Sequence, residues 1–358
     1  MALLFMDSAD HYATADLTEK WTTKQDAEIE SGGRNGTNCI HLGGTSDFGN
    51  LTATVLGGID EVIVGVAFKP HATWGGQASL ITFGSVNNWE CGLMVNADLT
   101  LQPFVAAAVQ FLPGYNTAFG YAALIGSPSV VALQGGVWAY VEVRMKCNGS
   151  TGTCVVHVNG TEVLDLSDLD TLYSSSVLTR VALGVRGVGT YYCTGFFDDL
   201  VVLDTTGDHN NDLLGDVTVA ALFPTADGNS HAWVCSTGTP DTGVDHDCVQ
   251  EAAPNDDTNY VTAGSVGLKS TFAMQDAPAG ADIRGVQLLV SARKVAEGPG
   301  QVMIVTRSNS TDYDSDALGL GSTSYSYVRQ IMDADPATGD PWLEADWNAA
   351  EVGMKKTG

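Results

Sequence analysis

Short runs in which apolar and polar residues alternate recur along the whole chain. In residues 136–166, apolar side chains occupy every second position of the first run: Val137, Ala139, Val141, Val143 and Met145. A period of two is typical of a half-buried β-strand. The connection 148–153 is rich in Asn and Gly, and Asn159-Gly160 is a strong hairpin signal. The pattern therefore predicts a three-stranded antiparallel meander.

Similar runs fill both halves of the chain. The clearest ones are residues 62–68, 79–83, 181–185 and 196–203 in the first half, and 217–223, 267–274, 285–293 and 301–306 in the second. Long stretches with the 3.6-residue period of a helix are missing from the sequence. We therefore predict an all-β protein with two β-sandwich, jelly-roll-like domains.

The predicted domain boundary lies in a small, polar and acidic stretch, residues 205–212. A chain of 358 residues is too long for one ordinary core and suits two domains. We place the first domain at 1–206 and the second at 207–358. Within the second, residues 233–260 are polar and acidic and contain two cysteines, so we expect an exposed loop there.

Composition and charge narrow the classes of partner. Hydrophobic residues make up 44% of the chain and charged residues 16%, with no apolar run near the roughly 20 residues that span a bilayer. The net charge of −26 repels phosphate backbones and anionic lipid heads, so we expect neither nucleic-acid binding nor membrane insertion. The first residues lack the basic segment of a secretory signal, and we expect no signal-dependent secretion.

The seven cysteines include two pairs that flank loops. Cys147 and Cys154 border the hairpin connection, while Cys235 and Cys248 enclose residues 236–247. Both spacings permit a disulfide. The alternative is that the cysteines are small buried hydrophobic residues with free thiols.

Candidate chemistry is sparse. Four loop carboxylates are weak candidates for an irregular calcium site, although acidic loops are usually just solvated: Asp198, Asp204, Asp208 and Asp212. With 42 acidic residues, any single carboxylate pair is uninformative about glycoside hydrolysis. We find no catalytic constellation and no cofactor motif, and therefore expect a protein that is not an enzyme.

Four longer segments resemble a family of tailed-bacteriophage virion structural proteins. They are FMDSADHYATADLTEKWTT (5–23), GGRNGTNCIHLGG (32–44), GFFDDLVVLDTTGDHNNDLLGDVTV (195–219) and DPATGDPWLEADWNAAEVGMKKTG (335–358). The hairpin 136–166 is part of the same resemblance. These segments lie in both halves of the chain.

The resemblance implies a laminin-G or concanavalin-like jelly roll for the first domain. It also implies a place on the outside of the particle, in the tail, the neck or collar, or the head decoration, after assembly in the host cytoplasm. The partners would be other virion proteins and copies of the same chain. Our leading hypothesis is a non-enzymatic virion protein that acts through many subunit contacts.

Two rival hypotheses concern carbohydrate. In the first, the protein is an adhesin for host surface glycan, in which loop aromatic residues stack on sugar and a loop calcium orders the site. The aromatic candidates, which core packing would also explain, are Trp74, Trp89, Tyr115 and Tyr191. The second rival, a polysaccharide-degrading enzyme, is disfavoured because no recognisable acid and base accompany the fold.

Overall fold

The chain folds into two compact units. The computed structural model describes residues 2–43, 49–106, 122–184, 193–236, 245–295, 298, 300–321 and 323–358. The first unit comprises Ala2–Ala9 and Trp21–Val219, and the second comprises Asp10–Lys20 and Ala220–Gly358. The expected boundary at 206/207 thus lies inside the first unit, because polar contacts described below hold residues 212–219 on its sheet.

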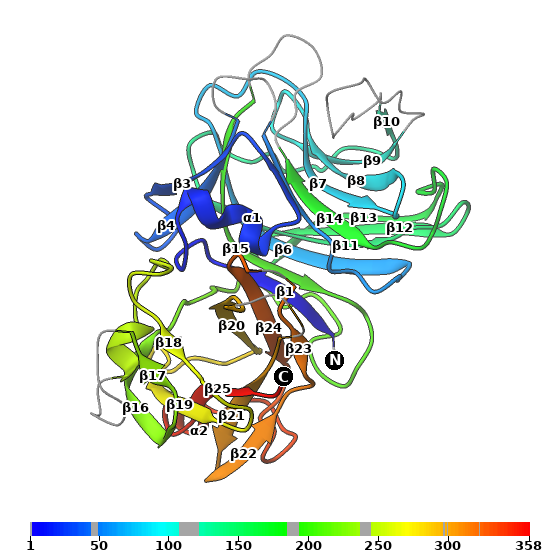
Figure 1. The fold of residues 1–358 in the computed structure, drawn as a ribbon. Coiled ribbons are helices and arrows are strands. Elements are labelled where there is room, and N and C mark those ends of the chain that lie inside the picture. Colours follow the sequence, from blue (N-terminus) through cyan, green and yellow to red (C-terminus); the bar gives the residue numbers. More distant parts are fainter. Residues whose placement is uncertain are drawn as a thin grey trace. The chain divides into compact units, whose positions relative to one another are not determined.

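The first unit is a sandwich of two antiparallel sheets (Figure 1). The eight-stranded sheet contains β1 (Leu3–Asp7), β3 (Ala27–Ser31), β4 (Asn38–Leu42), β6 (Glu61–Pro70), β11 (Ala139–Lys146), β12 (Gly152–Val158), β13 (Thr161–Leu169) and β15 (Gly195–Leu203). The seven-stranded sheet has the order β10 (Ala122–Leu124), β9 (Leu101–Ala106), β8 (Trp89–Val95), β7 (Ala78–Gly84), β14 (Arg180–Gly184), β5 (Asn50–Ala53) and β2 (Thr23–Gln25). The prediction of an all-β sandwich is confirmed.

The hairpin region forms the predicted meander. Strand β11 pairs antiparallel with β12, and β12 with β13. Asn159 and Gly160 have φ values of 50° and 74°, the left-handed region that a tight hairpin turn requires and that Asn and Gly tolerate. The apolar side of β11 is fully buried, which explains the alternation in its sequence.

The two sheets enclose the core of the first unit. The thiol of Cys91 on β8 lies beside that of Cys147, which follows β11 in the opposite sheet, and this neighbour and burial raise the pKa of Cys91. The face of β8 that carries Cys91 therefore looks into the sandwich. Cross-strand partners share a face, so Phe83 lies on this inner face beside Cys91, and Ile81 beside Leu93. All of these side chains are buried.

No disulfide joins Cys147 to Cys154, and both are buried free cysteines. The register explains this outcome, because Cys154 pairs with Met145 and Cys147 lies two residues beyond that position. Diagonal neighbours in a sheet are about 7–8 Å apart, which is farther than a disulfide spans. The Cys147 thiol instead donates to the carbonyl oxygen of Thr171, at 3.4 Å.

The second unit is also built of β-strands. Its six-stranded sheet contains β16 (Pro224–His231), β19 (Lys269–Met274), β25 (Glu351–Lys356), β21 (Gln301–Ser308), β22 (Thr311–Asp314) and β23 (Leu318–Gly319). A pair of strands, β20 (Val286–Ala292) and β24 (Ser326–Met332), shares a buried cluster with this sheet. Trp342 and Trp347, the latter in α2 (Glu344–Asn348), pack edge to face in that cluster with centroids 5.9 Å apart.

Short helical elements complete the described chain. They are η1 (Thr14–Asp16), α1 (Leu17–Lys20) and η2 (Asp245–Cys248). No helix in the described ranges has the length and apolar character needed to cross a membrane.

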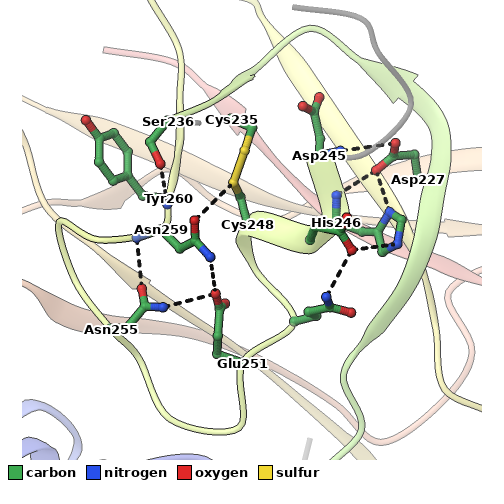
Figure 2. Close-up of a disulfide and its surroundings, with 12 residues drawn as sticks. Asp227, Cys235, Ser236, Asp245, His246, Cys248, Glu251, Asn255, Asn259 and Tyr260 are labelled. Atoms are coloured by element: carbon green, nitrogen blue, oxygen red, sulfur yellow. Dashed lines mark hydrogen bonds and ion pairs between the residues drawn. A yellow bond between two sulfur atoms is a disulfide. The ribbon is translucent and has the colours of Figure 1, made fainter. Parts of the chain in front are cut away.

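The described parts of 233–260 contain short regular elements. Strand β17 (Val234–Cys235) pairs with β18 (Val261–Thr262), and a disulfide joins Cys235 to Cys248 (Figure 2). Both cysteines are buried. Asp227 on β16 accepts a 2.7 Å hydrogen bond from the backbone nitrogen of His246, which ties η2 to the sheet. Trp233, at the start of the segment, belongs to a small apolar cluster with Phe272, Val302 and Met354. The exposed loop stays a prediction for the segment as a whole.

Removing this disulfide should destabilise the second unit. The bridge closes a loop with a sequence separation of 13 residues, for which the loss of chain entropy in the unfolded state contributes about 3 kcal/mol. The double variant Cys235→Ala/Cys248→Ala should lower the free energy of unfolding by that amount in a denaturant titration. Cys193→Ala, which removes a cysteine outside the disulfide, is the control. Equal unfolding curves for the double variant and the unmodified chain would contradict the bridge.

Candidate functional site

The side of the seven-stranded sheet that faces away from the eight-stranded sheet combines small and polar residues. We call it the outer face and define it by the strand register. One row is Gln25, Asn50, Gly184, Ser79, Met94 and Gln102; the next is Thr23, Thr52, Ala182, Thr82, Gly92 and Phe104; the third is Arg180, Gly84 and Trp89. Ser79 belongs here because its hydroxyl lies 3.2 Å from where a Cβ of Gly184 would be.

Three polar side chains of the outer face are buried without a hydrogen-bond partner. Asn50, Thr52 and Ser79 are 4%, 3% and 4% exposed. Asn50 Oδ1, Thr52 Oγ1 and Ser79 Oγ make no hydrogen bond within the structure. Leaving such an atom unsatisfied costs about 1–3 kcal/mol, so a cluster of three on one face is unusual for a purely structural surface. These three oxygens are polar atoms of the outer face that no group of the described structure satisfies.

Small residues stand between the polar ones in the rows of the outer face. Gly92 has no side chain, and the ring of Phe104 occupies the space where a Cβ of Gly92 would stand, at 2.8 Å. Ala182 packs with Trp89 in a buried cluster. The outer face therefore offers an apolar patch beside its row of hydroxyl and amide groups, a mixture typical of small-molecule sites.

Arg180 adds a positive charge to this face. Its guanidinium lies 4.3 Å from the centroid of the Trp89 ring, and both side chains lie over Gly84. Arg180 is partly buried, and this desolvation lowers its pKa from the ordinary value. Its Nε atom is buried and makes no hydrogen bond in the structure. The guanidinium of Arg180 is therefore held against the Trp89 ring, and its Nε donor has no partner.

The nearest acid, Glu90, is occupied by other donors. Its Oε1 accepts hydrogen bonds from the hydroxyls of Ser85 and Ser174, at 2.8 and 2.7 Å. Its Oε2 accepts from the backbone nitrogens of Ser174 and Ser175, at 2.6 and 3.1 Å. Glu90 therefore interacts with Arg180 only through its charge.

The four aromatic candidates do not gather at one site. Trp89 lies on the outer face, and Trp74 donates from Nε1 to the carbonyl oxygen of Asn96, at 3.1 Å, while packing edge-on against Phe68. Trp89 and Asn96 bracket β8 at opposite ends. Tyr115 and Tyr191 lie outside the described residues. Of the two candidates that the structure describes, Trp89 is the one beside an unpartnered polar group, the Nε of Arg180.

The four candidate calcium aspartates do not share one site. Asp198 accepts from the backbone nitrogen of Arg34 at 2.8 Å, and Asp204 caps Thr206 at 2.8 Å. Asp212 pairs with Arg144 at 3.2 Å, and Asp208 is exposed. Within the described ranges, no three His, Cys, Asp or Glu side chains come together as metal ligands.

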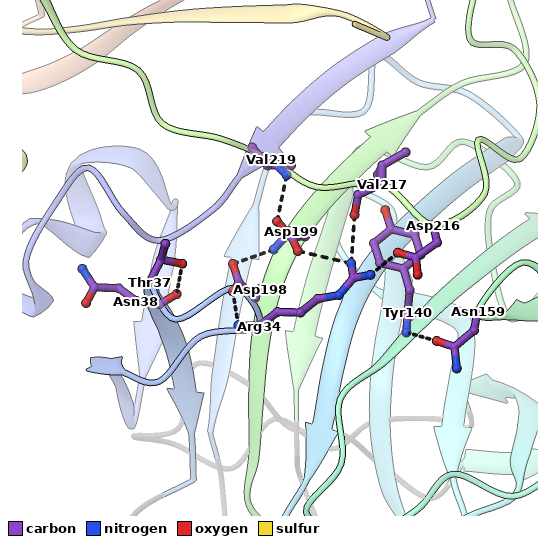
Figure 3. A network of polar contacts seen from close by, with 10 residues as sticks. All are labelled: Arg34, Thr37, Asn38, Tyr140, Asn159, Asp198, Asp199, Asp216, Val217 and Val219. Atoms are coloured by element: carbon purple, nitrogen blue, oxygen red, sulfur yellow. Dashed lines mark hydrogen bonds and ion pairs between the residues drawn. The ribbon is translucent and has the colours of Figure 1, made fainter. Parts of the chain in front are cut away.

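Arg34 organises a polar network on the opposite sheet that the sequence did not reveal (Figure 3). Its Nη1 donates to Asp199 Oδ2 at 3.3 Å and to the carbonyl oxygen of Val217 at 2.9 Å, and its Nη2 pairs with Asp216. Asp199 Oδ1 accepts from the backbone nitrogen of Val219 at 2.7 Å. The guanidinium lies 5.2 Å from the ring centroid of Tyr140. The network attaches residues 216–219 to the eight-stranded sheet.

Comparisons with known proteins found similar solved structures but no match among family models or curated proteins. No family model and no curated protein matches the chain. An endo-β-1,4-glucuronan lyase from the fungus Trichoderma reesei has 13% identity over 51% of this chain and 90% of its own, with a TM-score of 0.38. The alginate lyase Aly36B has 18% identity over 56% and 97%, with a TM-score of 0.38. The carbohydrate-binding module CBM66 from Bacillus subtilis has 12% identity over 52% and 96%, with a TM-score of 0.34.

These matches correct one expectation. Two of the three are polysaccharide lyases, so the expectation that the chain is not an enzyme is overturned. At this identity and these TM-scores, the likeness assigns neither an activity nor a substrate.

Proposed function

We propose that this chain binds carbohydrate through the outer face of its seven-stranded sheet. The observation that carries the proposal is the set of buried, unpartnered oxygens on Asn50, Thr52 and Ser79. Sugar hydroxyls both donate and accept, so they match hydroxyl and amide oxygens on a rigid surface. The ring of Phe104 and the small residues beside it supply the apolar contact that sugar rings also require.

Thr52→Val tests this proposal. The substitution keeps the shape of the side chain and removes the hydroxyl, so binding to the best ligand on a glycan array should weaken about tenfold, the value of one hydrogen bond of about 1.4 kcal/mol. Thr161→Val, on the exposed edge of the other sheet, is the matched control and should bind normally. The proposal fails if the unmodified chain binds no saccharide, or if Thr52→Val binds as tightly as the control.

We also propose that the chain is a component of a tailed-bacteriophage particle, where glycan binding would serve attachment to the host. The four family-like segments support this proposal, and two of them supply the Arg34 and Asp199 halves of the network in the first unit. Labelled antibody against the purified chain should decorate the outside of intact particles. The proposal is contradicted if complete particles, which contain all other virion proteins, bind no antibody.

A further inference from the structure

We infer that the ligand of the outer face is an acidic saccharide whose carboxylate pairs with Arg180. The inference rests on the proposed carbohydrate binding and adds the chemical class of the ligand. It starts from the guanidinium of Arg180, which is partly buried, stacked on Trp89 and without an ion pair in the described structure.

A partly buried cation without a counter-ion is costly unless something compensates its charge. Stacking on Trp89 orients the guanidinium but leaves its hydrogen-bond donors unused. Glu90 is saturated by Ser85, Ser174 and Ser175 and does not form an ion pair with Arg180. A ligand carboxylate is planar and matches the paired donors of a guanidinium, so it would complete this site.

The distribution of charge on the sheet points the same way. The chain has 42 acidic residues, yet the strands of the seven-stranded sheet carry Glu90 alone among acids. Their basic residues are Arg180 and Lys24, and Lys24 lies on the inner-facing side because it pairs with Leu51. The strand register therefore places one cation, Arg180, on the outer face of a strongly acidic protein, where it suits an anion that the surface elsewhere would repel.

The spacing of the groups indicates a ligand longer than one sugar. Arg180 and Gly184 are four positions apart on β14, which corresponds to about 13 Å along a strand. Ser79 and Asn50 flank Gly184, at the far end from Arg180. An acidic oligosaccharide can place a carboxylate on Arg180 while its hydroxyls reach the unpartnered oxygens.

Arg180→Gln and esterified ligands test the inference together. Oligogalacturonate and sialyllactose, each beside its methyl ester, are titrated into the full chain. The better acidic probe should bind at least tenfold more tightly than its ester, and Arg180→Gln should abolish that difference. Arg180→Lys should restore it only in part, because an ammonium group lacks the planar pair of donors. Arg284→Gln, which changes an exposed arginine of the second unit, is the control.

The outcomes separate this inference from the proposed function. Equal binding of acid and ester by the unmodified chain would overturn the acidic ligand and leave carbohydrate binding intact. A second result would also overturn it: Arg180→Gln binds both acids and esters more weakly, while its melting temperature is unchanged. Arg180 would then contribute to sugar binding without recognising the carboxylate. Binding of no saccharide defeats both proposals.

Discussion

Replacing Arg34 with alanine should lower the free energy of unfolding of the first unit by about 3–5 kcal/mol. The side chain of Asp199 is 2% exposed and would lose the cation that compensates its charge. Asp216 and Val217 would also lose their bonds to the guanidinium. A denaturant titration followed by tryptophan fluorescence measures the change.

Two control variants test whether the loss of stability comes from the Arg34 network. Arg284→Ala removes an exposed ion pair with Asp282 and should cost less than about 1 kcal/mol. Arg34→Lys keeps the charge but not the fork of donors, so it should recover part of the loss. If Arg34→Ala unfolds at the same denaturant concentration as Arg284→Ala, the network does not hold residues 216–219 on the sheet.

The stability of the first unit should fall as pH rises from about 5 to 7, through Glu142. Burial raises the pKa of this carboxyl from 4.5 to about 7. Between those values the folded state binds more protons than the unfolded state, so deprotonation favours unfolding. The full difference is roughly 3 kcal/mol and is reached above pH 7. Glu142 Oε1 accepts from the backbone nitrogens of Leu214 and Gly215, at 2.8 and 3.0 Å.

Glu142→Gln isolates this effect from the other acids. Glutamine stays neutral at every pH, so the variant should approach or exceed the unmodified chain in stability at pH 8 and lose that advantage at pH 5. The charges that act on Glu142 are those of Asp216 and Asp212, and Glu142 in turn acts on the phenol of Tyr140 on the same strand; all of these groups remain in the variant. Parallel pH profiles of the two proteins would show that Glu142 titrates normally.

The sheets of the first unit were largely predictable from sequence because their apolar residues alternate. Val141, Val143 and Met145 predicted β11, and Asn159-Gly160 predicted the turn that follows β12. The pattern does not show which strands become neighbours, so the placement of β6 between β11 and β15 came only from the structure. It also could not locate the contact of Arg34 with Asp216, which are far apart in sequence.

The outer face could not be identified from sequence for a related reason. Thr52 and Ser79 occupy polar positions of strands, and such positions are ordinarily solvent-exposed. Only the register shows that they share a face with Arg180, and only their burial shows that they lack partners. The aromatic residues attracted attention because of their type, although type alone does not distinguish Trp89 from core tryptophans.

A crystal structure of the chain with the acidic oligosaccharide that binds it most tightly tests the central claim directly. The account predicts that the sugar lies on the outer face of the seven-stranded sheet, with its hydroxyls on Thr52 and Ser79 and its carboxylate on Arg180. A saccharide bound anywhere else on the protein, with Thr52 and Ser79 untouched, would contradict it.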